Sequence, residues 1–356
     1  MIEDSFVFSK NFEGEFHTAW QAPSNIALVK YWGKNGQQLP KNPSISFTLS
    51  QCVTKTEVRF RPRKANDTAF DFLFDRQEKA DFHPKIMQFL DRIYPYLPSL
   101  ENHHLSIATE NSFPHSSGIA SSASAMAALA LCVVAFEKKH HPQWSTADSL
   151  KKASFLSRLG SGSAARSITG PLMVWGESTA YSNSSDLYAI APQTALHSVF
   201  NDYQDSILIV DKGQKKVSST LGHGLMEGHP FASQRFEQAH QNLNHIKTAL
   251  ATGDLDLFID TTEAEALSLH AMMMTSNPRF VLMQPQTLAI IHKTVAFRKE
   301  THLPICFTLD AGANVHLLYP KAQQQPITDF IQSELVAHCQ DGQYISDQLG
   351  TGAQKL

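Results

Sequence analysis

The sequence contains few cysteines, and they show no spacing typical of a disulfide framework or a metal site. Among 356 residues there are four, Cys52, Cys132, Cys306 and Cys339. They are widely separated and form no C-x-x-C pair, which argues against both a secreted disulfide scaffold and a thiolate zinc site. We expect these thiols to be reduced and mostly buried.

Long hydrophobic runs and an excess of charge of either sign are also lacking. The longest apolar run, Ala125 to Phe136, falls well short of the ~20 residues that cross a bilayer, so we expect a buried helix there. The net charge of −3 provides no broad basic field for nucleic acid or an anionic membrane. The acidic start of the chain does not resemble a secretory signal. We therefore expect a cytoplasmic protein without nucleic-acid or membrane partners, in which any phosphate binding is local.

The remaining composition is that of a globular protein, with 42% hydrophobic and 18% charged residues. The length suggests about two domains. Polar, turn-rich residues between positions 177 and 194 place the boundary near 190, and the element pattern predicts an α+β fold. Strands are predicted at 26–31, 45–49, 55–60, 69–74, 206–210, 305–309 and 315–319, and helices at 84–94, 120–136, 148–159, 231–251, 255–274, 285–298 and 329–338.

The first segment whose residues suggest a functional role is a run of small and hydroxyl residues, Asn111 to Ala125, which leads directly into the Ala-rich helix. Small side chains allow backbone amides to approach an anion, and a helix N-terminus favours phosphate. The segment is neither a Walker A loop nor a G-x-G-x-x-G motif. It predicts a nucleotide triphosphate site, and the alternative is a Ser-rich cap on a core helix.

A second segment, Leu159 to Ser167, surrounds Arg166 with glycines and serines. Exposed amides and hydroxyls bind anions, and a planar guanidinium grips a carboxylate or phosphate with two parallel bonds. The segment therefore indicates an anionic substrate. The alternative is a flexible surface turn with a solvated arginine.

A third segment, Ala22 to Lys34, is an apolar strand that ends in Lys30, Tyr31 and Lys34. If both lysines face a cleft, they supply positive charge for phosphates, and otherwise they are ordinary surface residues.

A fourth segment, Phe307 to Asn314, places Asp310 at the end of an apolar strand, two residues before Gly312. A strand fixes such a carboxylate while the turn leaves it accessible for catalysis. Alternatively, Asp310 caps the turn through its side chain.

The seventeen histidines do not form a recognisable metal motif. There is no H-E-x-x-H sequence, and His223, Glu227 and His229 are predicted to lie in a Gly-rich loop. We therefore predict no metal ion held by protein ligands.

Taken in order, the four segments resemble the diphosphomevalonate decarboxylase family, a branch of the GHMP group of small-molecule kinases. The likeness is close at 25–34, 44–49, the phosphate loop, 160–167 and 310–314, and weaker at 215–220 and 269–272. The resemblance implies a nucleotide-binding lobe at 1–190 and a ferredoxin-like lobe at 191–356. It also implies a homodimer.

The resemblance further implies an activity in the mevalonate pathway of isoprenoid biosynthesis. ATP, with Mg²⁺, would phosphorylate the tertiary 3-hydroxyl of (R)-5-diphosphomevalonate, after which phosphate and CO2 leave and isopentenyl diphosphate forms. A tertiary hydroxyl becomes a good leaving group only when phosphorylated, which makes this order chemically reasonable.

The same resemblance implies roles for individual residues. Asp310 would be the general base or orienting carboxylate, Lys30 would neutralise charge beside it, and Arg166 would hold the substrate carboxylate. Mg²⁺ would be held largely through phosphates. Substrate binding is assigned to Tyr31, Lys34, Arg76, Ser161, Gly162, Ser163 and Ser219, and ATP binding to Ser116, Ser117, Gly118, Ala120, Ser121, Ser122 and Ser124.

Four alternatives stay open at this point. A kinase would phosphorylate the alcohol without releasing CO2, although it would need no guanidinium on the carboxylate. A phosphomevalonate decarboxylase would act on the monophosphate. A Ser-Lys amidase would use a serine of the Gly-rich loops with Lys30 or Lys34, through an acyl-enzyme and without ATP. The fourth alternative is a non-catalytic nucleotide-binding module.

Overall fold

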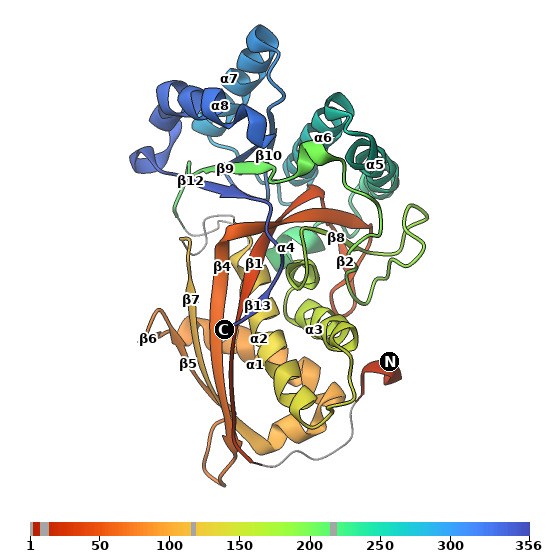
Figure 1. Ribbon diagram of the computed structural model, residues 1–356, viewed down its shortest axis with the longest axis vertical. Helices are drawn as coiled ribbons and strands as arrows, with labels where there is room; N and C mark the ends of the chain where they lie inside the picture. The colour runs from red at the N-terminus through yellow and green to blue at the C-terminus, as the bar shows by residue number, and fades with distance from the viewer. Residues whose placement is uncertain (1–2, 8–13, 115–118, 214–218) are drawn as a thin grey trace.

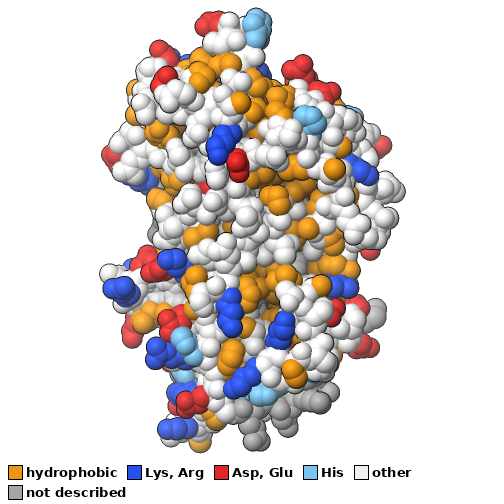
Figure 2. Space-filling view, in the orientation of Figure 1, with side chains coloured by type: hydrophobic (Ala, Val, Ile, Leu, Met, Phe, Trp, Pro, Cys, Tyr) orange, Lys and Arg blue, Asp and Glu red, His pale blue; other side chains and the backbone are white. Residues whose placement is uncertain are grey.

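The computed structural model describes residues 3–7, 14–114, 119–213 and 219–356, without the side chains of residues 219 and 220. The chain forms two lobes, one above the other in Figure 1, and each lobe combines a β-sheet with helices. The predicted α+β class is confirmed. Basic and acidic side chains are interspersed on the face shown in Figure 2, in keeping with the small net charge of −3.

The described part of the first lobe contains a seven-stranded sheet in the order β13-β1-β4-β7-β5-β6, with β8 paired to β4. Its pairs are antiparallel except β5 with β7. In β4, Thr56, Val58 and Phe60 are buried while Lys55 and Arg59 point outward, the alternation expected of a sheet with one covered face. The strands are β1 (Phe16–Val29), β4 (Ser44–Pro62), β5 (Phe70–Phe74), β6 (Gln77–Glu78), β7 (His103–Asn111), β8 (Leu172–Trp175) and β13 (Gln354–Lys355), and a separate hairpin is formed by β2 (Lys34–Asn35) and β3 (Leu39–Pro40).

One long strand, β4, replaces the two strands predicted at 45–49 and 55–60. The pairing of β1 with β4 shifts in register between Pro23 and Asn25, so the polar residues in the middle of β4 form a bulge and not a turn. The Asp347 carboxylate accepts hydrogen bonds from the amides of Ser50, Gln51 and Cys52 at 2.7–2.9 Å. This carboxylate comes from a distant part of the chain, which explains why the local sequence suggested a break.

Three helices cover the sheet of the first lobe: α1 (His83–Ile93), α2 (Ser121–Lys139) and α3 (Thr146–Gly160). Helix α2 is long and apolar enough to cross a membrane by length and composition, but 72% of its most apolar window is buried inside the protein. It is the core helix that the apolar run predicted. Helix α3 begins at Ser145, whose hydroxyl accepts a hydrogen bond from the Asp148 amide at 3.0 Å.

The second lobe has a four-stranded antiparallel sheet in the order β10-β11-β9-β12 among its described residues. The final helix begins at Gln324, earlier than the predicted 329, and continues as a π-helical turn. The strands are β9 (Gln204–Leu208), β10 (Cys306–Thr308), β11 (Val315–Tyr319) and β12 (Tyr344–Gln348), and the helices are α4 (Ser219–Gly224), α5 (Ala232–Thr252), α6 (Leu255–Thr275), α7 (Pro285–Thr301), α8 (Gln324–Phe330) and the π turn Ile331–Leu335. Short 3-10 helices lie at Asp4–Phe6, Ala80–Phe82, Tyr94–Tyr96, Pro98–Asn102, Gly162–Ser167, Ser198–Phe200, Lys321–Gln323, Val336–His338 and Gln340–Gly342.

The two lobes share a hydrophobic core, and the last strand of the chain joins the sheet of the first lobe. Ile26 and Phe47 of the first lobe belong to the same buried cluster as Tyr203, Leu243 and Phe258 of the second. After β12, the chain returns to the first lobe, where β13 pairs with the N-terminal half of β1. A single division near residue 190 therefore separates β13 from the lobe whose sheet it joins.

Candidate active site

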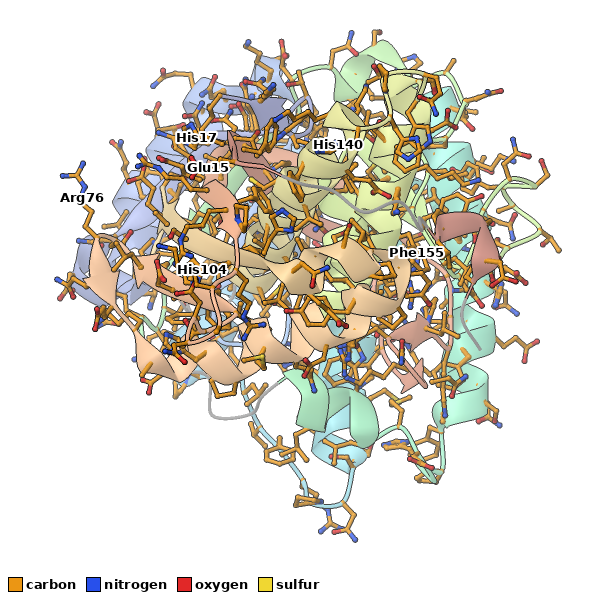
Figure 3. The ribbon with its side chains drawn as sticks, turned by 90° about the horizontal axis from the view of Figure 1, so that it is seen from below. Glu15, His17, Arg76, His104, His140 and Phe155 are labelled. Carbon is orange, nitrogen blue, oxygen red and sulfur yellow. The ribbon has the colours of Figure 1, made fainter. Side chains whose placement is uncertain are left out.

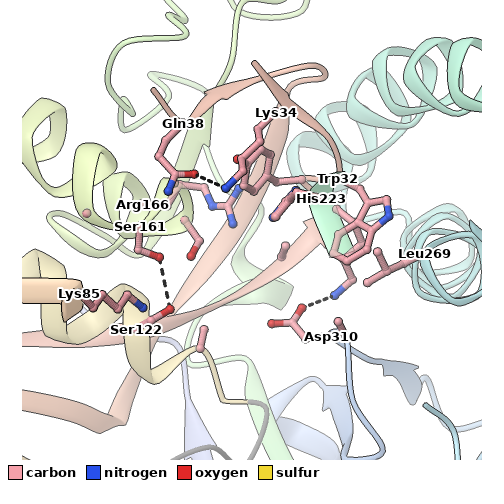
Figure 4. Close-up of a pocket in the computed structure, with 18 of the residues that line it drawn as sticks. Trp32, Lys34, Gln38, Lys85, Ser122, Ser161, Arg166, His223, Leu269 and Asp310 are labelled. Atoms are coloured by element: carbon pink, nitrogen blue, oxygen red, sulfur yellow. Dashed lines mark hydrogen bonds and ion pairs between the residues drawn. The ribbon is translucent and has the colours of Figure 1, made fainter. Parts of the chain in front are cut away.

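A cavity of about 340 Å³ lies where the end of β1 meets α1, the N-terminus of α2, the Gly162–Ser167 turn, α4 and the β10–β11 connection (Figure 4). It brings together residues from all four segments singled out in the sequence. The predicted residues that line it are Lys30, Tyr31, Lys34, Ala120, Ser122, Ser161, Gly162, Ser163, Arg166 and Asp310. The cavity therefore has a basic end at Lys34, a wall rich in serines, and the carboxylate of Asp310.

Lys30 and Asp310 form an ion pair at one side of this cavity, 3.1 Å between Nζ and Oδ1. Lys30 directly follows β1 and its side chain is 2% exposed, whereas that of Asp310 is 27% exposed. Burial lowers the pKa of Lys30, and Asp310 opposes that effect. The pair thus presents a carboxylate to the cavity beside an almost completely buried cation.

The backbone of Lys30 is held by a buried polar network that the sequence did not reveal. Its amide donates to Glu265 Oε2 at 2.8 Å, and its carbonyl accepts from Asn42 Nδ2 at 2.9 Å. Glu265, on α6, is fully buried and also pairs with Arg235 on α5, with a distance of 3.0 Å from Nη1 to Oε1. Asn242 donates to the same carboxylate. Two helices of the second lobe therefore fix the position of a lysine from the first.

The backbone of Asp310 is also fixed, which leaves its side chain facing the cavity. The Gly312 amide donates to the Asp310 carbonyl at 2.7 Å, so a backbone hydrogen bond closes the turn. The Nε2 atom of His270, on α6, lies 3.1 Å from the same carbonyl. Burial lowers the pKa of His270 to about 4, so the ring is neutral near pH 7 and donates through Nε2.

Arg166 is buried in the 3-10 turn beside the Lys30–Asp310 pair, and its exposed fraction is 3%. Its Nη1 atom donates to the Ser44 hydroxyl, and Nε donates to Asn25 Oδ1 at 3.4 Å. Its guanidinium carbon lies 5.9 Å from the centre of the Trp175 ring. Burial lowers the pKa of Arg166 to about 10, which keeps it charged at neutral pH. The guanidinium is thus held in one orientation at the cavity wall.

The basic end of the cavity contains Tyr31, Lys34, Ser161 and Ser163. Lys34 Nζ donates to Gln38 Oε1 at 3.2 Å, and burial together with nearby Arg92 lowers the pKa of Lys34. The Tyr31 hydroxyl is buried, and no described residue bonds to it. Gly162 permits this close packing, because a Cβ atom there would lie 2.9 Å from that hydroxyl.

The N-terminus of α2 fits a triphosphate. Ala120 precedes the helix in a left-handed conformation, with φ of 42°, and makes no side-chain capping bond. The Ala123 amide donates to the Ala120 carbonyl at 2.7 Å, and the start of an α-helix presents amide donors and a dipole that favour an anion. The hydroxyl of Ser122 lies 3.3 Å from that of Ser161, so the serine wall is continuous across the two segments. Ser121 is half-buried at the start of the same helix.

Three predicted ATP-binding or substrate-binding residues do not line the cavity: Ser121, at the start of α2, Ser124 and Arg76. Ser124 is fully buried and its hydroxyl lies 2.6 Å from that of Thr54, because one turn of α2 carries it into the core. Arg76 lies in the exposed turn between β5 and β6 and points away from the molecule in Figure 3. The structure therefore places neither Ser124 nor Arg76 at the cavity.

Lys85 takes the place at the cavity that the sequence analysis gave to Arg76. It lies on α1, and Figure 4 shows it beside Ser122 and Ser161. Gln88, one turn later on α1, also lines the cavity. Three predicted residues, Ser116, Ser117 and Gly118, lie outside the described part of the chain. Ser219 begins α4, but its side chain also lies outside the described part.

Both halves of the chain match families of known decarboxylases. Residues 22–188 match the diphosphomevalonate decarboxylase-like N-terminal domain, and residues 206–354 match the mevalonate 5-diphosphate decarboxylase C-terminal domain. A solved structure described as MDDEF in complex with MVAPP, AMPPCP and magnesium superposes with a TM-score of 0.82 at 27% identity, over 96% of this chain and 99% of that one. The predicted GHMP-kinase-like fold is confirmed.

Curated relatives agree with the structural match. The chain is 30% identical to the phosphomevalonate decarboxylase of Haloferax volcanii, over 82% of this chain and 84% of that protein. It is 31% identical to the diphosphomevalonate decarboxylase of Saccharomyces cerevisiae, over 87% of this chain and 79% of that protein. On this identity and coverage, and with Lys30, Arg166 and Asp310 gathered in one cavity, the chain belongs to the diphosphomevalonate decarboxylase family.

Proposed function

We propose that this protein catalyses the ATP-dependent decarboxylation of (R)-5-diphosphomevalonate to isopentenyl diphosphate, with ADP, phosphate and CO2 as the other products. The observation that carries this proposal is the convergence of Asp310, Lys30 and Arg166 on one cavity. This combination provides a proton acceptor, a cation beside it, and a guanidinium for a carboxylate.

Phosphoryl transfer to the 3-hydroxyl requires that the hydroxyl proton be removed. The Asp310 carboxylate accepts this proton as the new P–O bond forms and the bond to ADP breaks. Lys30, 3.1 Å from Asp310, stabilises the negative charge on the phosphoryl oxygens. The start of α2, with its amide donors and helix dipole, binds the ATP phosphates. Mg²⁺, when bound, neutralises charge on these phosphates.

The second stage releases CO2. Arg166 binds the substrate carboxylate and is held for this by Ser44 and Asn25. As the 3-phosphate leaves with the electrons of its C–O bond, a cationic centre develops at C3. The electrons of the carboxylate C–C bond then move toward C3, form the alkene and release CO2. No additional oxidant or reductant is required.

The diphosphate binds at the basic end, to Lys34, Tyr31, Ser161 and Ser163, with Lys85 at the wall formed by α1. The Ser-Lys amidase alternative needs a lysine bonded to a nucleophilic serine. Within the described residues, Lys30 Nζ bonds to Asp310 and Lys34 Nζ bonds to Gln38, and neither bonds to a serine. The arrangement favours phosphoryl transfer over acyl transfer.

We also propose that the protein is a homodimer located in the cytoplasm, without a membrane partner. The family resemblance supports the dimer, and the burial of the apolar helix α2 in the core supports a protein that does not insert into a bilayer. Light scattering of the purified full chain gives the mass, and cell fractionation gives the location.

The function is tested by measuring ADP, phosphate and CO2 together, with 5-phosphomevalonate and 5-diphosphomevalonate as separate substrates. We expect equal amounts of the three products from the diphosphate, and a higher kcat/KM than with the monophosphate. A stable 3-phosphorylated acid without CO2 would indicate a kinase. Preference for the monophosphate would support the activity named for the Haloferax relative, and turnover without ATP would overturn both readings.

A further inference from the structure

His223 lines the active-site cavity without having been assigned a role. It lies on α4, and its Nδ1 atom accepts a hydrogen bond from the Gly33 amide at 3.0 Å. The sequence analysis predicted a loop around His223, but the structure places this residue on helix α4. The hydrogen bond joins α4 to the segment that carries Tyr31 and Lys34, at the basic end of the cavity (Figure 4).

The imidazole ring is held on two sides by aromatic side chains. Its centre lies 4.2 Å from that of Tyr31 and 4.8 Å from that of Trp32. Gly222 allows α4 to approach this closely, because a Cβ atom there would lie 2.5 Å from the Trp32 ring. The ring therefore has one position, with Nδ1 directed to Gly33.

The surroundings of His223 also determine its protonation. Burial lowers its pKa to about 3, and the positive charges of Lys34 and Arg166 act in the same direction. The ring is therefore neutral near pH 7 and carries a single proton. Because Nδ1 accepts from the Gly33 amide, this proton is on Nε2. No described residue makes a hydrogen bond to Nε2, so this atom is a donor available to a ligand in the cavity.

We propose that His223 is a substrate-binding residue whose Nε2–H group donates a hydrogen bond to a phosphate oxygen of the substrate diphosphate. The proposal rests on the proposed function for the identity of this anion. The ring contacts Tyr31 and bonds to Gly33, which adjoins Lys34 in sequence, so it packs directly against the segment that carries two of the proposed diphosphate ligands. Lys34 and Lys85 already supply positive charge for the diphosphate, and the neutral Nε2–H group of His223 adds a directed hydrogen bond to it.

Two substitutions of His223 distinguish the roles of its two ring nitrogens. His223→Asn keeps an acceptor near Nδ1 for the Gly33 amide but removes the donor at the Nε2 position. His223→Gln places an amide donor near the Nε2 position. We expect His223→Asn to raise KM for diphosphomevalonate by about ten- to a hundredfold, since a hydrogen bond to a charged group is lost. We expect kcat to change by less than about twofold, and His223→Gln to recover most of the loss. His292→Asn, at an exposed position on α7, is the matched control.

NMR spectroscopy of the wild-type protein tests the proposal without relying on either variant. In the full-length wild-type protein with ¹⁵N-labelled histidine, we expect His223 to show the neutral Nε2–H tautomer, and its Nε2 resonance to shift on addition of inorganic pyrophosphate. An Nδ1–H tautomer, an unshifted Nε2 resonance, or an unchanged KM in a folded His223→Asn protein would overturn the proposal. Failure of the wild-type protein to release CO2 would instead overturn the proposed function, while the pyrophosphate experiment still tests His223.

Discussion

The ammonium group of Lys30 lies 3.1 Å from the carboxylate of Asp310, although the two residues are 280 positions apart in the chain. Lys30 follows the long strand β1 of the first lobe, and Asp310 follows β10 of the second. The shared core between the lobes therefore positions the two groups relative to each other. This contact makes the proposed chemistry depend on how the lobes pack, and not on either lobe alone.

Substitution of Arg166 by lysine tests the carboxylate-binding role. A lysine cannot reproduce the two parallel hydrogen bonds of a guanidinium, nor its contacts with Ser44 and Asn25. We expect kcat/KM to fall by about ten- to a hundredfold, since a hydrogen bond to a charged group is worth ~1.5–3 kcal/mol. Arg279→Lys, at an exposed position, serves as the control. Wild-type kinetics in folded Arg166→Lys would show that this residue does not hold the substrate.

A comparison of Lys85→Ala with Arg76→Ala tests which basic residue assists diphosphate binding. Lys85 lines the cavity, whereas Arg76 lies in the exposed β5–β6 turn. We expect Lys85→Ala to raise KM by about two- to fivefold, as is typical of an exposed ionic contact, and the effect to shrink at high salt. We expect Arg76→Ala to leave KM unchanged. The reverse result would restore the assignment made from the sequence.

The sequence predicted the fold class from local signals, and the family resemblance carried by four local segments assigned the roles of the main site residues. Hydrophobic periodicity located most helices. The segments around Lys30, Arg166 and Asp310 each left a structural alternative open, and only their joint resemblance to the family implied a role for each residue; the structure brings the three to one cavity. The sequence analysis named Arg76, whose side chain points away from the molecule, and did not name Lys85, because the direction of a side chain on α1 depends on how that helix packs.

The residues that the sequence did not reveal act through contacts between distant segments. Glu265 and Arg235 have no motif, and their support of the Lys30 backbone exists only because α5 and α6 pack against the end of β1. The bulge in β4 similarly depends on Asp347, which is almost 300 residues later. Ser124 looked like a phosphate ligand in the serine-rich run, but helix periodicity directs it into the core.

The stability of the protein should depend on pH through His270. Burial lowers the pKa of His270 to about 4 in the folded protein, compared with an ordinary value near 6.5 in the unfolded chain. The unfolded state therefore binds more protons between these values, and folding is disfavoured as pH falls from 6.5 toward 4. Between pH 6.5 and pH 5, we expect wild-type protein to lose about 1–2 kcal/mol more free energy of unfolding than His270→Gln, measured by urea denaturation.

The same experiment has an internal control, because the other histidines are present in both proteins. His292→Gln, at an exposed position on α7, should follow the wild-type curve. Parallel pH curves for wild type and His270→Gln would contradict the conclusion that a neutral His270 holds the Asp310 backbone.

The central claim, that Asp310 accepts the proton of the 3-hydroxyl, is tested most directly by single-turnover ADP formation in Asp310→Asn. Asparagine keeps the size of the side chain but cannot act as a base, so we expect ADP formation to slow by about a hundred- to ten-thousandfold. Binding of an ATP analogue to the same preparation should be retained, because the proposed phosphate site at the start of α2 lies on a different element. Asp329→Asn, exposed on α8, is the matched control. Slowed ADP formation with intact nucleotide binding is the predicted result, and ADP formation at the wild-type rate would contradict the account.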